Sequence, residues 1–210
     1  MTHGHGHQTG TAEAVPGSPQ FWEEFYRARP QVFSGRVNPI LAQTAEHLRP
    51  GTALDLGAGE GADTAWLAEH GWAVTAVDVS TTALDRVLER NSDVTVERHD
   101  LTATFPAGTF DLVNAQYLQS PDEAFPREAI LRRATAAVAP GGTLLIVGHG
   151  GHATNHAPQP TAHDVLTALA IDSATWDVDR CETVPRVVTR PDGTEVSVPD
   201  EVTQVRRVLV

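Results

Sequence analysis

The chain has 210 residues and a formal net charge of −12, with 27 acidic residues against 15 basic ones, all of them arginine. An acidic chain with scattered arginines argues against a nucleic acid or an anionic membrane as partner. The single cysteine, Cys181, excludes an internal disulfide and a thiolate metal cluster. No segment resembles a signal peptide or could span a bilayer, so we expect a cytoplasmic protein of one large domain, with its oligomeric state open.

The first eighteen residues show no hydrophobic periodicity, which predicts a disordered, histidine-rich tail over 1–18. Its alternating histidines, His3, His5 and His7, could bind a metal ion weakly. An accidental run in a flexible terminus is the simpler interpretation, and we predict no metal site. The remainder, 19–210, is expected to form a single domain.

Two short helices are predicted before the first strand. The first covers 21–29, because its aromatic residues recur at a spacing that places them on one helix face. These residues are Phe21, Trp22, Phe25 and Tyr26. The second covers 39–48, where Asn38 is a favourable N-cap and Pro39 a favourable first helical residue.

Strands and helices alternate through the middle of the chain. Strands are expected at 52–56, 72–77, 94–98, 110–115 and 143–147, and helices at 62–70, 80–90 and 125–138. This alternation is typical of βαβ units. It predicts an α/β fold, a Rossmann-like doubly wound and mostly parallel sheet with helices on both faces.

The C-terminal part has a different pattern. After a helix at 162–169, strands are expected at 175–179, 183–189, 195–198 and 202–209, with a turn at 190–194. This pattern predicts an antiparallel strand addition to the sheet. Its exposed edge could pair with a second subunit.

A glycine-rich loop follows the first predicted strand, in the sequence Asp55-Leu-Gly57-Ala58-Gly59-Glu-Gly61. Its glycines permit a tight turn and close approach of a ligand to the backbone, and the next helix begins there with unpaired N–H groups. Such a loop at the carboxyl end of a strand is where open α/β sheets bind ligands. Read loosely, the segment also fits the dinucleotide-binding pattern.

Two acidic residues follow the next predicted strands. Asp78 stands nineteen residues after Gly59, where a carboxylate can accept both ribose hydroxyls of an adenosine ligand. Asp100 comes just after the strand at 94–98 and could accept a hydrogen bond from an exocyclic amine. An ordinary loop aspartate is an equally good interpretation of Asp100 taken alone.

Together these motifs resemble those of the class I S-adenosylmethionine-dependent methyltransferases over roughly residues 20–150. The motifs are Leu-Asp-Leu-Gly-Ala-Gly-Glu-Gly, Val-Asp78, His-Asp100-Leu, Phe-Asp111-Leu-Val and Pro-Gly-Gly-Thr-Leu-Leu, in that order. Asp55 fills the family's acidic position two residues before the first glycine, where dinucleotide enzymes usually have an apolar residue.

The resemblance implies a set of cofactor-binding residues: Arg36, Asp55, Gly57, Ala58, Gly59, Asp78, Val79, Asp100, Leu101 and Gln116. Asp55 would reach the methionine ammonium, directly or through water, and Asp78 would hold the ribose hydroxyls. Asp100 would bind the adenine amine, with Val79 and Leu101 against the ring. The three loop residues would contact the cofactor through their backbone, and the glutamine would line its methionine end.

The segment from Phe21 to Pro39 is similar to small bacterial enzymes related to the tellurite-resistance methyltransferases. There the N-terminal segment folds over the cofactor as a lid, and Arg36 would pair with the cofactor's carboxylate. The resemblance thus divides the domain into a helical lid over 19–50, a cofactor-binding core over 51–150, and a loop, helix and antiparallel strands over 151–210. An aromatic helix that merely covers the core remains the alternative for the lid.

The methyl acceptor is expected beyond the last two parallel strands. Tyr117 and His149 are the candidate catalytic residues, because the ordinary pKa of histidine suits base chemistry near neutrality. Other expected lining residues are Trp22, Tyr26, Gln119 and His152. Further histidines at 152, 156 and 163 allow three readings, which are a substrate base, a metal site, or simply a polar flexible loop.

The expected function is in-line transfer of a methyl group to a small-molecule acceptor whose accepting atom the sequence does not give. Two alternatives remain open. An NAD(P)-dependent oxidoreductase would use the same glycine loop and Asp78, and a non-catalytic cofactor-binding protein would share the whole fold.

Overall fold

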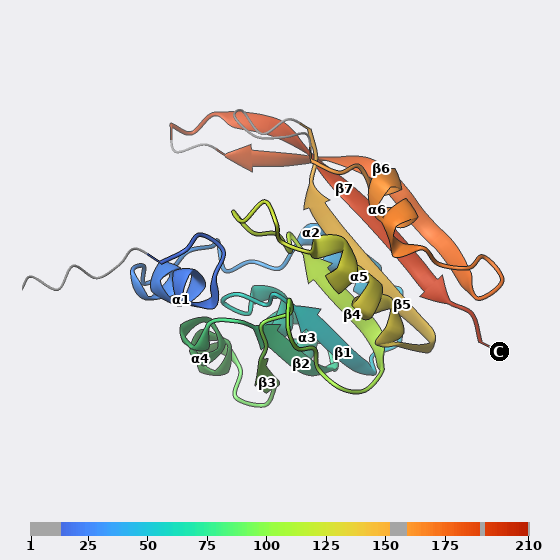
Figure 1. Cartoon of the computed structure of the whole chain (residues 1–210), viewed down its shortest axis with the longest axis horizontal. Helices are drawn as coiled ribbons and strands as arrows, with labels where there is room; N and C mark the ends of the chain where they lie inside the picture. Colours follow the sequence, from blue (N-terminus) through green and yellow to red (C-terminus); the bar gives the residue numbers. More distant parts are fainter. Residues whose placement is uncertain (1–13, 152–158, 190–191, 210) are drawn as a thin grey trace, which may run out of the picture.

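The computed structural model describes residues 14–151, 159–189 and 192–209. Its strands are β1 (Thr52–Leu56), β2 (Ala73–Asp78), β3 (Thr95–Arg98), β4 (Phe110–Gln116), β5 (Val138–His149), β6 (Trp176–Thr189) and β7 (Glu195–Arg207). Its helices are α1 (Pro19–Arg27), α2 (Pro39–Ala45), α3 (Ala62–Glu69), α4 (Thr81–Arg90), α5 (Arg127–Ala136) and α6 (Ala162–Leu169) (Figure 1).

All seven strands form one sheet in the order β3-β2-β1-β4-β5-β7-β6. The first five strands pair in parallel, whereas β7 runs antiparallel to both β5 and β6. The predicted Rossmann-like, doubly wound sheet with an antiparallel C-terminal addition is therefore confirmed. The strand order reverses between β1 and β4, which places a ligand crevice at the carboxyl ends of these two strands.

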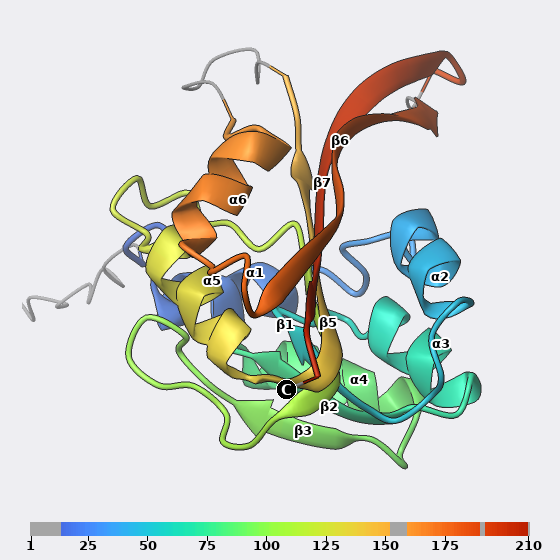
Figure 2. The same cartoon turned by 90° about the vertical axis from the view of Figure 1, so that its right-hand side faces the viewer.

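Helices cover both faces of the sheet, as Figure 2 shows. On one face α5 and α6 pack against alternate strand residues such as Leu144, and on the other α2, α3 and α4 pack against residues such as Leu145. Successive residues of a strand point to opposite faces, so a strand buried on both sides is apolar at nearly every position. This explains the continuous run Leu-Leu-Ile-Val in β5.

The helix starts follow their capping residues. Ser18, Asn38, Ser80 and Thr161 each accept a hydrogen bond from the first turn of the helix that they cap. The helix ends differ more from expectation. The helix predicted over 39–48 ends at Ala45, and α1 begins and ends two residues before its predicted bounds.

β5 is longer than the predicted strand 143–147. The Pro-Gly-Gly segment lies inside β5, where it makes the pairing with β4 irregular but does not end it. Val138 already pairs with Phe110, and the ladder resumes at Thr143 opposite Leu112. A Cβ at Gly142 would lie 2.9 Å from two main-chain oxygens, so the close strand approach requires glycine there.

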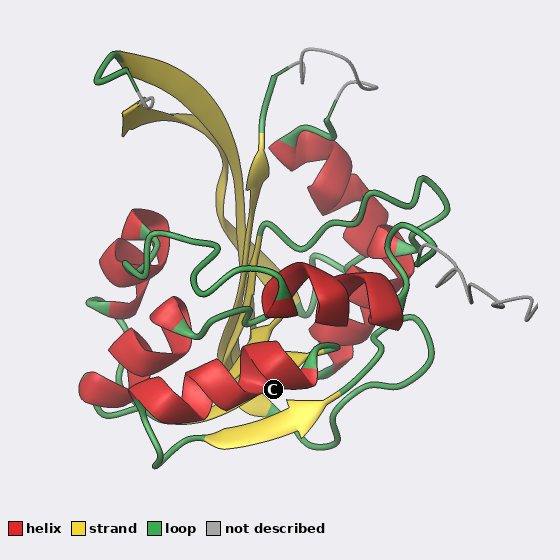
Figure 3. Cartoon of the chain, turned by 90° about the vertical axis from the view of Figure 1, so that its left-hand side faces the viewer, coloured by secondary structure: helices red, strands yellow, loops and turns green. Residues whose placement is uncertain are grey.

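β6 and β7 are each continuous where two shorter strands were expected. Pro185 faces Pro199 across the ladder. A non-hydrogen-bonded pair of an antiparallel ladder needs no N–H from either residue, so two facing prolines do not break it. The pairing of β7 with β5 ends at His149, and the far half of the β6–β7 hairpin therefore extends beyond the rest of the sheet (Figure 3).

Within the described ranges, every helix is too short or too polar to cross a lipid bilayer.

We predict that Leu145→Ala lowers the free energy of unfolding by about 2–5 kcal/mol, because it empties a fully buried site in the central strand β5. The matched control is Leu209→Ala, whose side chain is 76% exposed and whose effect should stay within about 0.5 kcal/mol. Urea unfolding measures both. Equal losses in the two variants would contradict the assigned core.

Candidate functional site

The glycine loop (57–61) leaves β1 in a conformation that side chains rarely adopt. Gly57, Gly59 and Gly61 have φ values of 70°, 53° and 75°. A Cβ at Gly57 would lie 2.9 Å from Leu118 Cδ1, and one at Gly61 would lie 2.8 Å from Val87 Cγ2. The three glycines of this loop at the carboxyl end of β1 are thus required by their positive φ values, and at Gly57 and Gly61 also by the close approach of Leu118 and Val87.

Asp78 ends β2 beside this loop and is buried. Its Oδ2 accepts a hydrogen bond from Gly59 N–H at 3.0 Å, and its Oδ1 accepts one from Ser80 N–H at 2.9 Å. Burial raises the pKa of Asp78, and these backbone donors counteract the rise. Each carboxylate oxygen retains acceptor capacity for a further donor.

A chain of buried polar groups runs from Asp55 toward the end of β4. Asp55 accepts hydrogen bonds from Thr64 at 2.6 Å and from Asn114 Nδ2 at 2.9 Å, and it is only 2% exposed. Asn114 Oδ1 accepts one from Gln116 Nε2 at 2.6 Å, whereas the buried Gln116 Oε1 has no partner among the described residues. The chain of hydrogen bonds therefore ends in an unused acceptor, Gln116 Oε1.

A second carboxylate, Asp63, lies beside this chain at the start of α3. Burial and the charge of Asp55 both raise its pKa, and Asn38 N–H donates to its Oδ1 at 2.7 Å. A cation bound near these two carboxylates would stabilise their charged forms.

The segment after β3 is bound to the end of β2, because His99 N–H donates to the Asp78 carbonyl at 3.1 Å and Arg98 Nε to the Val79 carbonyl at 2.9 Å. Leu101 is buried and Val79 half-buried. Asp100 accepts hydrogen bonds from Thr102 N–H and Oγ at its Oδ1, at 3.0 and 2.6 Å. Asp100 thus orders its own turn, as an ordinary loop aspartate does, and a role toward a ligand stays a prediction.

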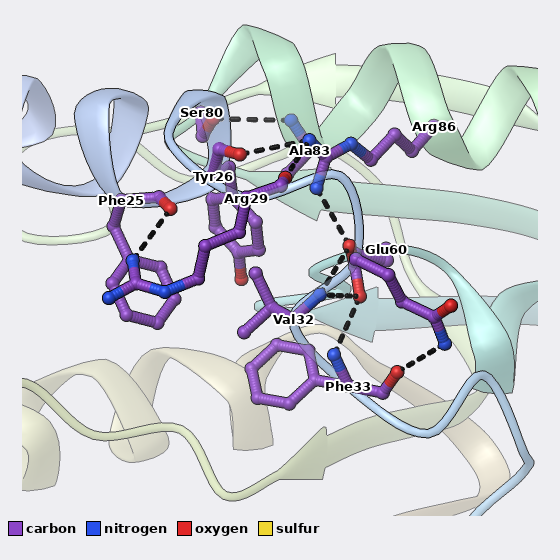
Figure 4. A network of polar contacts seen from close by, with 10 residues as sticks. Phe25, Tyr26, Arg29, Val32, Phe33, Glu60, Ser80, Ala83 and Arg86 are labelled. Atoms are coloured by element: carbon purple, nitrogen blue, oxygen red, sulfur yellow. Dashed lines mark hydrogen bonds and ion pairs between the residues drawn. The ribbon is translucent and has the colours of Figure 1, made fainter.

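The N-terminal segment is bound to the glycine loop through Glu60, as Figure 4 shows. The buried Glu60 carboxylate accepts the N–H groups of Val32 and Phe33 at 2.9–3.1 Å and pairs with Arg86 at 2.7 Å. Arg86 also donates to the carbonyls of Tyr26 and Arg29, at 2.9 and 2.6 Å. One carboxylate and one guanidinium thus join three separate segments of the chain.

Aromatic side chains from the same N-terminal segment cover the loop. The Tyr26 hydroxyl would lie 3.1 Å from a Cβ at Gly59, with the Phe33 ring 3.5 Å away. Glu23 fixes α1 to the start of α4, because it accepts hydrogen bonds from Ser80 and from Thr82 at 2.6–3.2 Å. Arg36, expected to bind a carboxylate, is exposed at the rim of this segment.

The carboxyl ends of β4 and β5 bring the two candidate catalytic residues together. The Tyr117 and His149 rings stack with centroids 4.4 Å apart. Tyr117 O–H donates to Asp200 Oδ2 at 2.8 Å, and Arg186 Nε donates to the same oxygen at 2.7 Å. Tyr117 also has a φ of 50°, unusual for a residue with a side chain and typical of functional sites.

Burial and this charged environment set the protonation of both residues. Burial, reinforced by the Arg186 cation, lowers the pKa of His149 below its ordinary value of 6.5, although the Asp200 charge opposes the shift. Burial and the hydrogen bond to Asp200 raise the pKa of Tyr117 to about 12. At neutral pH the imidazole is therefore mainly neutral, with one ring nitrogen available as an acceptor, and the phenol remains a donor.

A pocket opens at the same strand ends, next to α5 and α6. Its lining includes Tyr117, Leu118, Gln119, Arg127, Gly148, His149, Val165 and Glu201. Three of the expected acceptor-site residues thus line it, while Trp22 and Tyr26 lie together in the aromatic cluster of the N-terminal segment. His152 and His156 lie outside the described residues. Over 14–151, 159–189 and 192–209, no group of acids, histidines or cysteine could hold a metal ion.

Comparison with known proteins identifies the central part of the chain. Residues 53–142 match the family model described as "Methyltransferase domain". A stretch of 62 residues is 50% identical to the ribosomal RNA small subunit methyltransferase C of Alcanivorax borkumensis. That match covers 26% of this chain, and the chain spans about a fifth (19%) of that protein's length.

Solved methyltransferase structures share the fold over most of the chain. N-methyltransferase NodS from Bradyrhizobium japonicum, solved with S-adenosyl-L-homocysteine, has a TM-score of 0.65 at 19% identity over 89% of this chain and 98% of that one. TehB from Haemophilus influenzae has a TM-score of 0.63 at 15% identity over 89% and 67%. Residues 53–142 thus match a methyltransferase domain, and the chain shares the fold of these solved methyltransferases, in agreement with the resemblance in its motifs.

Several residues around the site escaped the sequence analysis. Glu60 and Arg86 bind the N-terminal segment, and Arg186 and Asp200 reach the strand ends from the C-terminal hairpin. The Glu60 position carried no signal, because the pattern of the glycine loop does not specify which residue stands between its last two glycines. The pair from the hairpin depends on the register of β7 against β5, in which Asp200 faces His149.

We predict that Glu23→Gln destabilises the protein by about 1–2 kcal/mol at about pH 6, because it weakens the hydrogen bonds to α4. Burial alone would raise the pKa of Glu23, but the hydrogen bonds from Thr82 and Ser80 lower it to about 2. The stabilisation is therefore complete above the ordinary value of 4.5 and is lost as pH falls toward 2. Urea unfolding from about pH 6 to about pH 3 should show the difference between wild type and variant shrinking.

The matched control for this experiment is Glu24→Gln, the neighbouring and exposed glutamate of α1. It should leave the stability and its pH dependence unchanged. A constant difference between wild type and Glu23→Gln across the pH range would contradict the assigned anchor.

We also predict that the imidazole of His149 titrates below 6.5 in an NMR titration of the histidine rings, with His149→Gln used for assignment. Arg186→Gln should raise this pKa, because it removes a nearby cation that disfavours the imidazolium. Arg180→Gln, on the same strand but paired with Glu182, is the control and should have no effect. A wild-type pKa at or above 6.5 would refute the assigned environment.

Proposed function

We propose that the protein is a methyltransferase that moves the methyl group of S-adenosylmethionine to a small-molecule acceptor held at the carboxyl ends of β4 and β5. The observation that carries the proposal is the bare glycine loop at the end of β1, hydrogen-bonded through Gly59 to the buried Asp78 at the end of β2. The methyltransferase domain matched over 53–142 contains both features.

The residues present fit this cofactor. The glycine loop would hold its methionine and ribose portions through Gly57, Ala58 and Gly59, and Asp78 would accept the ribose hydroxyls. The unpartnered Gln116 Oε1, backed by Asn114 and Asp55, supplies the acceptor that an ammonium group requires. Asp100, Val79 and Leu101 remain the proposed adenine site, and the exposed Arg36 the proposed carboxylate partner.

The N-terminal segment over 19–50 would act as a lid. Its attachment to Glu60 and Arg86 places Tyr26 and Phe33 above the glycine loop. A lid that closes on this loop would exclude water from the reacting groups. The histidine-rich tail proposed for the residues before it falls almost wholly on residues outside the described ranges.

When bound, S-adenosylmethionine supplies a methyl group already activated by its sulfonium. What remains for the protein is to hold the acceptor in line, which can contribute on the order of 7–11 kcal/mol in favourable cases. Tyr117 would donate a hydrogen bond to the acceptor or position it, and neutral His149 would accept a proton if the accepting atom must lose one.

A small acceptor is favoured over RNA. The curated relative named for ribosomal RNA shares only a short stretch with this chain, so its substrate does not carry over. The net charge of −12 and the scattering of the arginines along the sequence argue against a nucleic acid as partner. The single cysteine fits the cytoplasmic location that we expect.

We predict that S-adenosyl-L-homocysteine binds the wild-type protein with a Kd of about micromolar order and that NAD does not bind, as measured by isothermal titration calorimetry. Asp78→Asn should weaken this binding by about 10–100-fold, because the proposed ribose contacts are hydrogen bonds to a charged group. The exposed Asp93→Asn is the matched control and should bind as wild type does.

Binding of NAD in place of S-adenosyl-L-homocysteine would favour the oxidoreductase alternative. The non-catalytic alternative needs a separate assay, in which labelled S-adenosylmethionine is incubated with a panel of small acceptors and the products are identified by mass spectrometry. Methylated product in any reaction excludes a purely cofactor-binding protein.

A further inference from the structure

Arg127 is a charged residue in the pocket that the proposed reaction has not used. It stands at the first position of α5, and its half-buried side chain lines the pocket together with Tyr117, Gln119 and His149. Its Nε donates to the Leu118 carbonyl at 2.9 Å, which directs the guanidinium along the end of β4.

The terminal nitrogens of Arg127 reach β5. Its Nη2 lies 3.5 Å from where a Cβ would stand at Gly148, so the absence of a side chain at that position leaves room for the guanidinium beside the strand. The pocket also touches the glycine loop, because Leu118 lines the pocket and lies against Gly57. A group bound by Arg127 would therefore sit close to the proposed methyl donor.

The Arg127 cation has no carboxylate within 4 Å over the described ranges, and the segment 152–158 contains no acidic residue. The adjacent Glu128 points to Arg132, at 3.8 Å. One hydrogen bond to Leu118 uses one of the five N–H donors of a guanidinium. Burial lowers the pKa of Arg127, as expected for a cation that lacks a full set of partners.

The acids around the pocket are already engaged. Glu201, which lines it, accepts hydrogen bonds from Ala162 N–H at 2.8 Å and from the Thr183 hydroxyl at 3.1 Å. Asp200 Oδ2 is paired with Arg186 and Tyr117, whereas its buried Oδ1 has no partner among the described residues. Among the charged groups at this end of the described sheet, Arg127 is left with unused donors.

We propose that this pocket binds a carboxylate group of the methyl acceptor through the Arg127 guanidinium. The planar fork of arginine matches a carboxylate with two parallel N–H···O bonds. The inference rests on the proposed methyltransferase function and adds to it a substrate class, small organic acids.

The test measures the preference of the protein for an acid over its neutral amide with S-adenosyl-L-homocysteine bound. The probe pairs are benzoate with benzamide and indole-3-acetate with indole-3-acetamide, titrated and followed by ligand NMR. In the wild type, at least one acid should bind about tenfold or more tightly than its amide, as a hydrogen-bonded charge pair does.

Arg127→Gln should reduce this ratio to about one, and Arg127→Lys, which keeps the charge without the planar fork, should retain part of it. The matched control is Arg132→Gln, because Arg132 lies on the same helix and also donates to a carbonyl, that of Ala168, at 2.9 Å. It should keep the wild-type ratio. Each variant is first titrated with S-adenosyl-L-homocysteine, whose binding should not change.

The outcomes separate the two proposals. If S-adenosyl-L-homocysteine binds but no acid is preferred, or if the preference survives in Arg127→Gln, the carboxylate site is wrong and the methyltransferase function stands. A ratio in Arg127→Lys as low as that in Arg127→Gln would assign the effect to the Leu118 contact and also overturn the site. Failure of the wild type to bind S-adenosyl-L-homocysteine removes both proposals together.

Discussion

The placement of the N-terminal segment depends on one buried carboxylate. Glu60 is 4% exposed and stands between two glycines of left-handed conformation, so its backbone belongs to the glycine loop while its side chain binds the N-terminal segment. A buried carboxylate is stable only when its lone pairs are filled, and here two backbone N–H groups and the Arg86 guanidinium fill them. The glycine loop, the N-terminal segment and α4 are therefore coupled, since moving any of them away leaves a charge without a partner.

The central sheet could be predicted from the sequence because its signals are local. β1 and β2 are short apolar runs that end beside a glycine and at an acid, and several helix starts carry a side-chain cap, as Ser80 does for α4. The antiparallel pairing of the C-terminal hairpin was predicted, but the continuity of β6 and of β7 was not. Proline normally ends a strand, and only the facing of Pro185 with Pro199 shows why these two do not.

The candidate site likewise contains residues that local sequence patterns reveal and residues that only the tertiary structure brings together. The glycine loop and Asp78 lie in one local unit, so spacing along the chain was enough to find them, although their contacts with a ligand stay predictions. Arg186 and Asp200 contact Tyr117 although they lie up to 83 residues away from it in the sequence. These contacts depend on strand pairing, and the local sequence does not encode the register of that pairing. Arg127 lacked a signal altogether, because one arginine at a helix start usually faces solvent.

The charges at the carboxyl edge of the sheet are unevenly distributed. Near the glycine loop, Asp55, Asp63 and the unpartnered Gln116 Oε1 give an excess of acceptors, and burial raises the pKa values of both acids. A nearby cationic group would lower these pKa values, as an ammonium would. On the far side of Leu118, Arg127 gives an excess of donors. A cationic cofactor and an anionic acceptor would each meet a complementary field, and the electrostatic attraction between them would favour the approach that methyl transfer requires.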